Sequence, residues 1–196
     1  MHHIPLFPLQ AVLFPHGRMP LQIFEPRYLD LIKDSLKNNR GFGVVWLRDG
    51  REVAGVKASP KVRLAEIGTF AEIVDWHSLD NGLLGVVIEG QRKFTINSSA
   101  QQADGLWRAE IDWIAEEPFI ALSPESEELM VLLRQLLRHP QIAQLGMPEE
   151  CEDVDSLTCM LCQLLPIDEA TKYALLSAMD PLTRLEELMD LLAALE

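Results

Sequence analysis

The hydrophobic residues of this chain follow two different periods, and the change between them falls near residue 117. Before that point, apolar residues alternate with polar ones or form short runs bounded by turn residues, which is typical of β-strands. Beyond Pro118 they recur every three or four residues, which is typical of amphipathic α-helices. The sequence therefore predicts a β-rich domain at 1–117 and a helical lobe at 118–196.

The β-rich part is expected to contain about six or seven strands. Asp80-Asn81-Gly82 is a strong hairpin-turn signal between two apolar runs. The expected strands are 42–47, 62–76, 83–89, 94–97 and 106–114, with short extended pieces between the N-terminal prolines. Short strands at regular spacing with glycine corners predict a small closed or semi-closed barrel.

One helix is predicted inside the β-rich part. It begins at Pro26, a favoured first helical residue, and Gly41 supplies a stop. Leu29, Ile32 and Leu36 recur with helical spacing, so we expect them to form its apolar face.

Four amphipathic helices are predicted after Pro118. Their expected N-terminal caps are Ser123, then Asp155 or Ser156, then Asp168 and Asp180. The fold class is therefore α+β: a β-barrel with one inserted helix, followed by a four-helix lobe.

The net charge of −13 comes entirely from the second half of the chain. Residues 1–113 carry 13 Lys and Arg against 13 Asp and Glu, whereas residues 114–196 carry four against 17. An acidic lobe repels phosphate backbones, so nucleic acid is an unfavourable partner, although a neutral barrel leaves room for a local basic patch.

The chain lacks the features of a membrane or secreted protein. Its longest apolar stretches are far shorter than the ~20 residues that span a bilayer. The N-terminus has no basic segment, and Pro5 and Pro8 interrupt any signal-peptide core. Three cysteines cannot all pair, so we expect a reduced, cytoplasmic protein without a membrane partner.

The common signatures of enzymes are absent. There is no phosphate-binding G-x-x-x-x-G-K-[ST] loop, no G-x-G-x-x-G fingerprint and no G-x-S-x-G nucleophile motif. We therefore expect no catalytic residues, no cofactor and no enzymatic activity.

Two residue sets invite a functional interpretation but favour a structural one. Cys159 and Cys162 have the C-x-x-C spacing of zinc and redox sites, with Cys151 nearby, but a fourth ligand is missing and both lie on a leucine-rich helix. We expect no metal. The four tryptophans (Trp46, Trp76, Trp107 and Trp113) resemble a base-stacking platform, yet their strand patterns favour packing in the core.

The most distinctive segment is the proline-rich run at residues 4–28. It reads IPLFPLQAVLFPHGRMPLQIFEPRY, and it resembles the opening of the Lon substrate-binding domain, the N-terminal domain of the ATP-dependent protease Lon. Further matches are Gly68-Thr69, Gly90 to Phe94, and the closing Asp180-Pro181 with Arg184-Leu185. The resemblance spans essentially the whole chain.

This resemblance implies both a fold and a function. The fold is a PUA-like barrel followed by helices. In Lon proteases this domain recognises protein substrates, while ATPase and protease domains follow it. The chain stops where those domains would begin, so we expect a stand-alone, non-catalytic peptide-binding module, related to proteolysis through its partners. Unfolded or extended polypeptides are the expected partners, with a protease or a chaperone as a further candidate.

The segment Phe24 to Tyr28 has two interpretations. In the functional one, Phe24, Arg27 and Tyr28 lie at the rim of a peptide-binding surface. In the structural one, the Glu25 carboxylate favours the helix N-terminus, Arg27 braces it and Tyr28 packs on the barrel. RNA binding is the alternative function, because PUA-like barrels also bind RNA.

Overall fold

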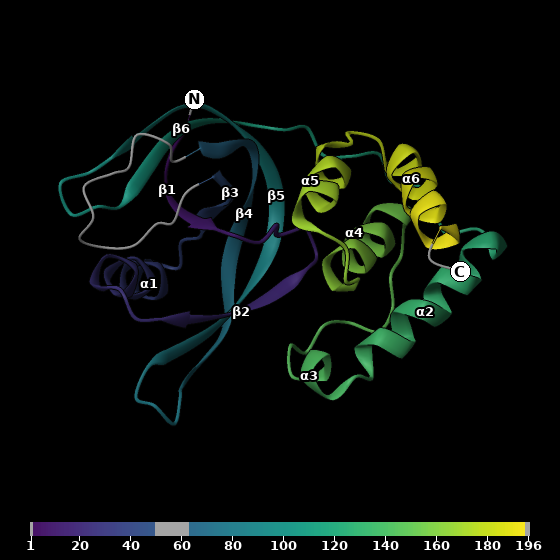
Figure 1. Ribbon diagram of the computed structural model, residues 1–196, viewed down its shortest axis with the longest axis horizontal. Coiled ribbons are helices and arrows are strands. Elements are labelled where there is room, and N and C mark those ends of the chain that lie inside the picture. The colour runs from purple at the N-terminus through teal and green to yellow at the C-terminus, as the bar shows by residue number, and fades with distance from the viewer. Residues whose placement is uncertain (1, 50–62, 195–196) are drawn as a thin grey trace.

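The protein is built from a β-barrel and a group of helices that lie to one side of it (Figure 1). A computed structural model describes residues 2–49 and 63–194. The strands are β1 (His2–Leu9), β2 (Arg18–Ile23), β3 (Phe42–Asp49), β4 (Arg63–Ser78), β5 (Leu84–Gln101) and β6 (Trp107–Trp113). The helices are α1 (Pro26–Asn38), α2 (Glu127–Leu137), α3 (Pro140–Ala143), α4 (Val154–Leu164), α5 (Glu169–Ser177) and α6 (Pro181–Ala193), with a 3-10 turn at Pro124–Ser126. The predicted α+β fold is confirmed.

The sheet closes on itself through its longest strand. The strand order is β2-β5-β4-β3-β1-β6, and β6 also pairs with β5. The expected turn at Gly82 joins β4 to β5, and Gly82 adopts a φ of 80° there. The expected strands 83–89 and 94–97 are one strand, because β5 continues through Gly90 and pairs along its length with β4, β2 and β6. The expected start of β4 at Val62 lies outside the described residues.

Helix α1 covers one part of the barrel and buries Ile32 as expected, but its buried face is rotated from the one expected. Its buried residues include Tyr28, Leu31 and Ile32, whereas Leu29 and Leu36 are 37% and 43% exposed. The period was right, but the barrel contacts the face one residue earlier in the turn. The helix ends at Asn39 in the left-handed conformation rather than at Gly41.

The helical lobe contains the four expected helices, which are α2, α4, α5 and α6, and the additional single turn α3. Asp168 and Asp180 cap α5 and α6 as predicted. The cap of α4 is Asp153, which accepts a hydrogen bond from the Ser156 N–H, and neither Asp155 nor Ser156 has that role. In the described part of the chain, no helix combines the length and apolar character that crossing a membrane requires.

The segment between β1 and β2 joins the barrel to the lobe. Val12 and Phe14 are fully enclosed in the apolar core of the helical lobe. The Phe14 N–H donates to Oε1 of Gln163 in α4 (2.9 Å), and the Val12 N–H donates to Glu169 at the start of α5 (2.6 Å). A division into domains at residues 117 and 118 stays a prediction, and the two parts share this piece of core.

Candidate functional site

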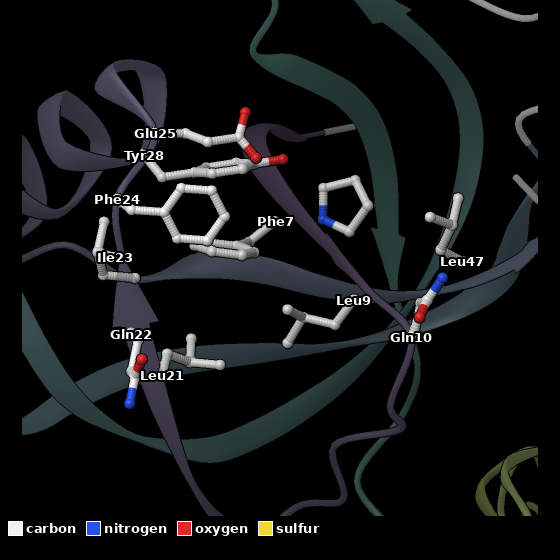
Figure 2. A pocket seen from close by; sticks show the side chains of 11 residues that line it. Phe7, Leu9, Gln10, Leu21, Gln22, Ile23, Phe24, Glu25, Tyr28 and Leu47 are labelled. Atoms are coloured by element: carbon white, nitrogen blue, oxygen red, sulfur yellow. The ribbon is translucent and has the colours of Figure 1, made fainter. Parts of the chain in front are cut away.

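A cavity of about 470 Å³ lies between β1 and β2, beside the start of α1 (Figure 2). Its walls are mostly apolar, with Phe7, Leu9, Leu21, Ile23 and Leu47 among the residues that line it. Two glutamines, Glu25 and Tyr28 supply the polar side chains of the lining. The cavity is large enough to hold one or two bulky side chains of a partner.

The cavity exists because two strands of the barrel do not pair with each other. In the described part of the chain, β2 pairs only with β5. Strand β1 pairs with β6 over His2–Leu6 and with β3 over Leu6–Leu9, so beyond Leu6 one of its edges has no strand beside it among the described residues. The β1 and β2 residues on either side of this gap line the same cavity.

Stacked aromatic rings form one wall of the cavity. The rings of Phe7 and Tyr28 lie 4.0 Å apart and nearly parallel, and both side chains are buried. Phe24, in contrast, is 66% exposed at the rim. An exposed phenylalanine beside a buried aromatic wall offers apolar contact area to a partner.

Arg27 lies behind this wall. It is 9% exposed, and its guanidinium lies 4.7 Å from the centre of the Tyr28 ring. Its Nε and Nη2 contact Oε2 of Glu25 at 3.0 and 2.9 Å, and its Nη1 donates to the Gly105 carbonyl at 2.7 Å. Arg27 therefore links the start of α1 to the turn before β6 and holds Tyr28 and Glu25 in place.

The structure thus brings Phe24 and Tyr28 to the cavity and places Arg27 in contact with Tyr28. Sequence reasoning missed the cavity residues of β1 and β2, namely Phe7, Pro8, Leu9, Leu21, Gln22 and Ile23, and also Gln10 just after β1. One signal was available. Pro8 and Pro20 lack a backbone N–H, and prolines in strands are typical of unpaired edges.

The tryptophans do not form one exposed stacking surface. Trp46, Trp107 and Trp113 pack partly buried against the barrel core, as expected. The expectation of core packing is wrong for Trp76, which is 59% exposed near the end of β4. Strand β4 extends beyond the barrel into a hairpin with β5 (Figure 1), so an alternating pattern there does not imply burial.

A second cavity, of about 310 Å³, opens where the barrel meets the lobe. Beside it lies a buried ionic cluster of Lys93, Glu117, Asp155 and Arg184, with His16 at its edge. Arg184 is fully buried and contacts Glu117 and Asp155, each at 2.6 Å. Lys93 pairs with Glu117 and donates to the carbonyls of Leu176 and Ala178. The cluster fastens β5 and the chain after β6 to α4 and α6.

The charges of this cluster shift the pKa values of its titratable members. Contact with Asp155 raises the pKa of His16, against the opposing effect of its burial. Burial alone would raise the pKa of Asp155, but His16 and the charge of Arg184 lower it to about 2.

Replacing His16 by Asn is expected to lower stability more in acid than in base. A raised His pKa stabilises the fold below the ordinary value of 6.5, and this contribution is lost as the pH rises through the folded value. Asn tolerates the φ of 61° at this position. Since the His16 side chain is 49% exposed, we expect an effect of at most about 1 kcal/mol. Urea denaturation at about pH 5.5 and about pH 8.5 measures it, and an effect that is equal at both values, or that persists when Asp155 is replaced by Asn, contradicts it.

Cys159 and Cys162 are buried, whereas Cys151 is only partly buried. Burial raises the pKa of Cys159 well above its ordinary value and that of Cys162 to about 12, so both thiols are neutral at pH 7. Within 2–49 and 63–194, no three or more His, Cys, Asp or Glu side chains are arranged to hold a metal ion. Metal independence stays a prediction.

Comparison with known proteins agrees with this architecture. The crystal structure of a Lon N-terminal domain protein from Xanthomonas campestris superposes with a TM-score of 0.72 at 29% identity, covering 97% of this chain and 98% of that one. Lon protease 2 of Myxococcus xanthus is 30% identical over 202 residues, which is 96% of this chain and 23% of the protease. Cereblon of Danio rerio is 28% identical over 130 residues, which is 62% of this chain.

The chain spans less than a third of the length of these curated relatives. The model of the ATP-dependent protease La (LON) substrate-binding domain matches residues 3–194. A match over nearly the whole chain, together with a solved neighbour of equal extent, shows that this chain belongs to the LON substrate-binding domain family.

Proposed function

We propose that the protein is a non-catalytic module that binds unfolded or extended polypeptide segments at the cavity between β1 and β2. The observation that carries this proposal is an apolar cavity beside two open strand edges, with Phe24 exposed at its rim. A concave apolar site with a few polar groups is the usual form of a binding site for side chains. Membership of a family named for substrate binding supports the same function.

The three residues of the predicted site have different roles in this proposal. Phe24 contacts the partner directly, because its ring is exposed. Tyr28 forms the wall of the cavity, stacked on Phe7. Arg27 is a positioning residue that holds Tyr28 and Glu25. A protease or a chaperone as the user of the captured segment, and a cytoplasmic location, are further parts of the proposal.

The charge of the partner follows from the charge of the chain. Glu25, the one acidic or basic side chain among the described residues that line the cavity, is paired with Arg27, so the preference comes from the chain as a whole, which carries −13. Basic segments are therefore attracted, mainly through the rate of encounter. Because a flexible segment loses conformational entropy when it binds, we expect affinities that are roughly micromolar or weaker.

Phe24→Ala is expected to weaken peptide binding about five- to tenfold without changing stability, since an exposed aromatic at a binding site contributes to affinity but little to the core. The measurement is fluorescence anisotropy with a labelled seven-residue peptide of the sequence KTFTFTK. Phe119→Ala is the matched control, because Phe119 is 68% exposed and does not line the cavity.

The same assay tests the charge preference. The acidic counterpart ETFTFTE should bind more weakly, and the difference should shrink at high salt, which screens the attraction. If neither peptide binds at any salt concentration while a structured RNA does, peptide binding is wrong and the RNA-binding alternative replaces it.

A further inference from the structure

Strand β2 borders the cavity with an open edge, where a partner could bind through its backbone as well as through its side chains. Strand β2 forms a ladder with β5 over its whole length, from Arg18 opposite Glu89 to Ile23 opposite Leu84. Its other edge has no strand beside it among the described residues. A strand edge presents backbone donors and acceptors that can pair with another chain.

The direction of these backbone groups follows from one hydrogen bond. The Gly90 N–H donates to the Gly17 carbonyl at 2.9 Å, immediately before the regular ladder begins. Backbone groups of successive residues point to opposite sides of a strand, so Met19, Leu21 and Ile23 face β5. Pro20 and Gln22 therefore present their backbone groups to the open side, where Gln22 lies beside the cavity.

We propose that an extended polypeptide segment pairs with this edge as an added β-strand, with the N–H and C=O of Gln22 bonding its backbone while one of its bulky apolar side chains enters the cavity. This inference rests on the proposed function and deepens it. Pairing of this kind recognises the backbone of any sequence, and a neighbouring pocket then selects a side chain. The net charge of the chain, −13, favours segments that also carry basic residues.

Pro20 limits how long the added strand can be. Its backbone faces the open side but offers only a carbonyl, because proline has no N–H. The edge therefore provides one complete donor and acceptor pair at the cavity, at Gln22, instead of a continuous ladder. Edge prolines also discourage pairing between copies of the same chain. These features suit brief capture of a foreign segment better than stable self-association.

Gln22→Pro tests the proposal on the protein itself. It removes the outward-facing N–H and no bond to β5, and prolines are tolerated on edge strands at such positions. We expect binding of the labelled KTFTFTK peptide to weaken about tenfold. Gln22→Ala, which keeps the backbone N–H and removes the side chain, measures what the side chain contributes, and the loss in Gln22→Pro should clearly exceed it. Equal losses in the two variants would assign the effect to the side chain and overturn strand pairing.

A second measurement leaves the protein unchanged. Two versions of the probe carry N-methyl groups on alternate backbone nitrogens. One is methylated at the two phenylalanines and the other at the three threonines. Only one set of amides can face β2, so one version should lose binding and the other should retain it. This test remains valid even if Gln22→Pro lowers the stability of the fold.

The outcomes separate the two proposals. If both methylated probes and the Gln22→Pro variant bind normally while Phe24→Ala weakens binding, strand pairing is wrong and the peptide-binding function stands. If unmodified KTFTFTK does not bind, both proposals fail. If sedimentation shows a dimer that Gln22→Pro dissociates, the edge is occupied by a second copy, which also overturns the inference.

Discussion

Glu117→Gln is expected to destabilise the protein by about 3 to 5 kcal/mol, because it removes the shared partner of two buried cations. Lys93 and Arg184 are 5% and 0% exposed, and both pair with this carboxylate. After the substitution, Asp155 is the remaining carboxylate paired with Arg184 in the described part of the chain. The measurement is urea denaturation at neutral pH.

Glu116→Gln is the matched control for this variant. Glu116 is exposed and adjacent in sequence, so its substitution changes the net charge by the same amount and should alter stability by less than about 0.5 kcal/mol. Equal effects of the two substitutions would mean that net charge, and not the buried cluster, determines the result.

Phe14→Ala is expected to destabilise the protein by about 3 to 5 kcal/mol, since it empties a fully buried aromatic position. Phe14 belongs to the chain between β1 and β2 but packs in the core of the lobe. We expect one cooperative unfolding transition at lower urea, with the tryptophans of the barrel and the helices of the lobe changing together. Phe119→Ala is again the control.

The same experiment tests the predicted division into domains. If Phe14→Ala produces two separate transitions, with the helical signal lost first, the parts on either side of residues 117 and 118 fold independently. If the transition stays single, the boundary separates two architectures within one cooperative unit.

The architecture was largely predictable from the sequence because it depends on local periodicity. The change from strand to helix spacing near Pro118, the turn at Gly82 and the caps at Asp168 and Asp180 are short-range signals. The sequence did not reveal that α1 is buried through Tyr28 and Leu31 rather than Leu29 and Leu36, because that face is set by the position of the barrel.

The candidate site was only partly predictable, for a different physical reason. Phe24 and Tyr28 lie in a recognisable motif, but the cavity arises because β1 and β2 do not pair. A missing pairing depends on the closure of the whole barrel and leaves only an indirect trace in the sequence, the prolines at 8 and 20. The buried ionic cluster also joins residues far apart in the chain, from Lys93 to Arg184.

The contact between Phe14 and Gln163 has a consequence for how the protein is made. The two residues are 149 positions apart, and Phe14 is synthesised first because it lies nearer the N-terminus. At roughly 5 to 20 residues per second, about 7 to 30 seconds pass before Gln163 of α4 has been synthesised. During that time Val12 and Phe14 lack the core in which they are finally enclosed. A nascent chain with these side chains exposed is a substrate for chaperones. The protein, which we propose binds unfolded segments, is therefore itself a partly unfolded chain during its synthesis.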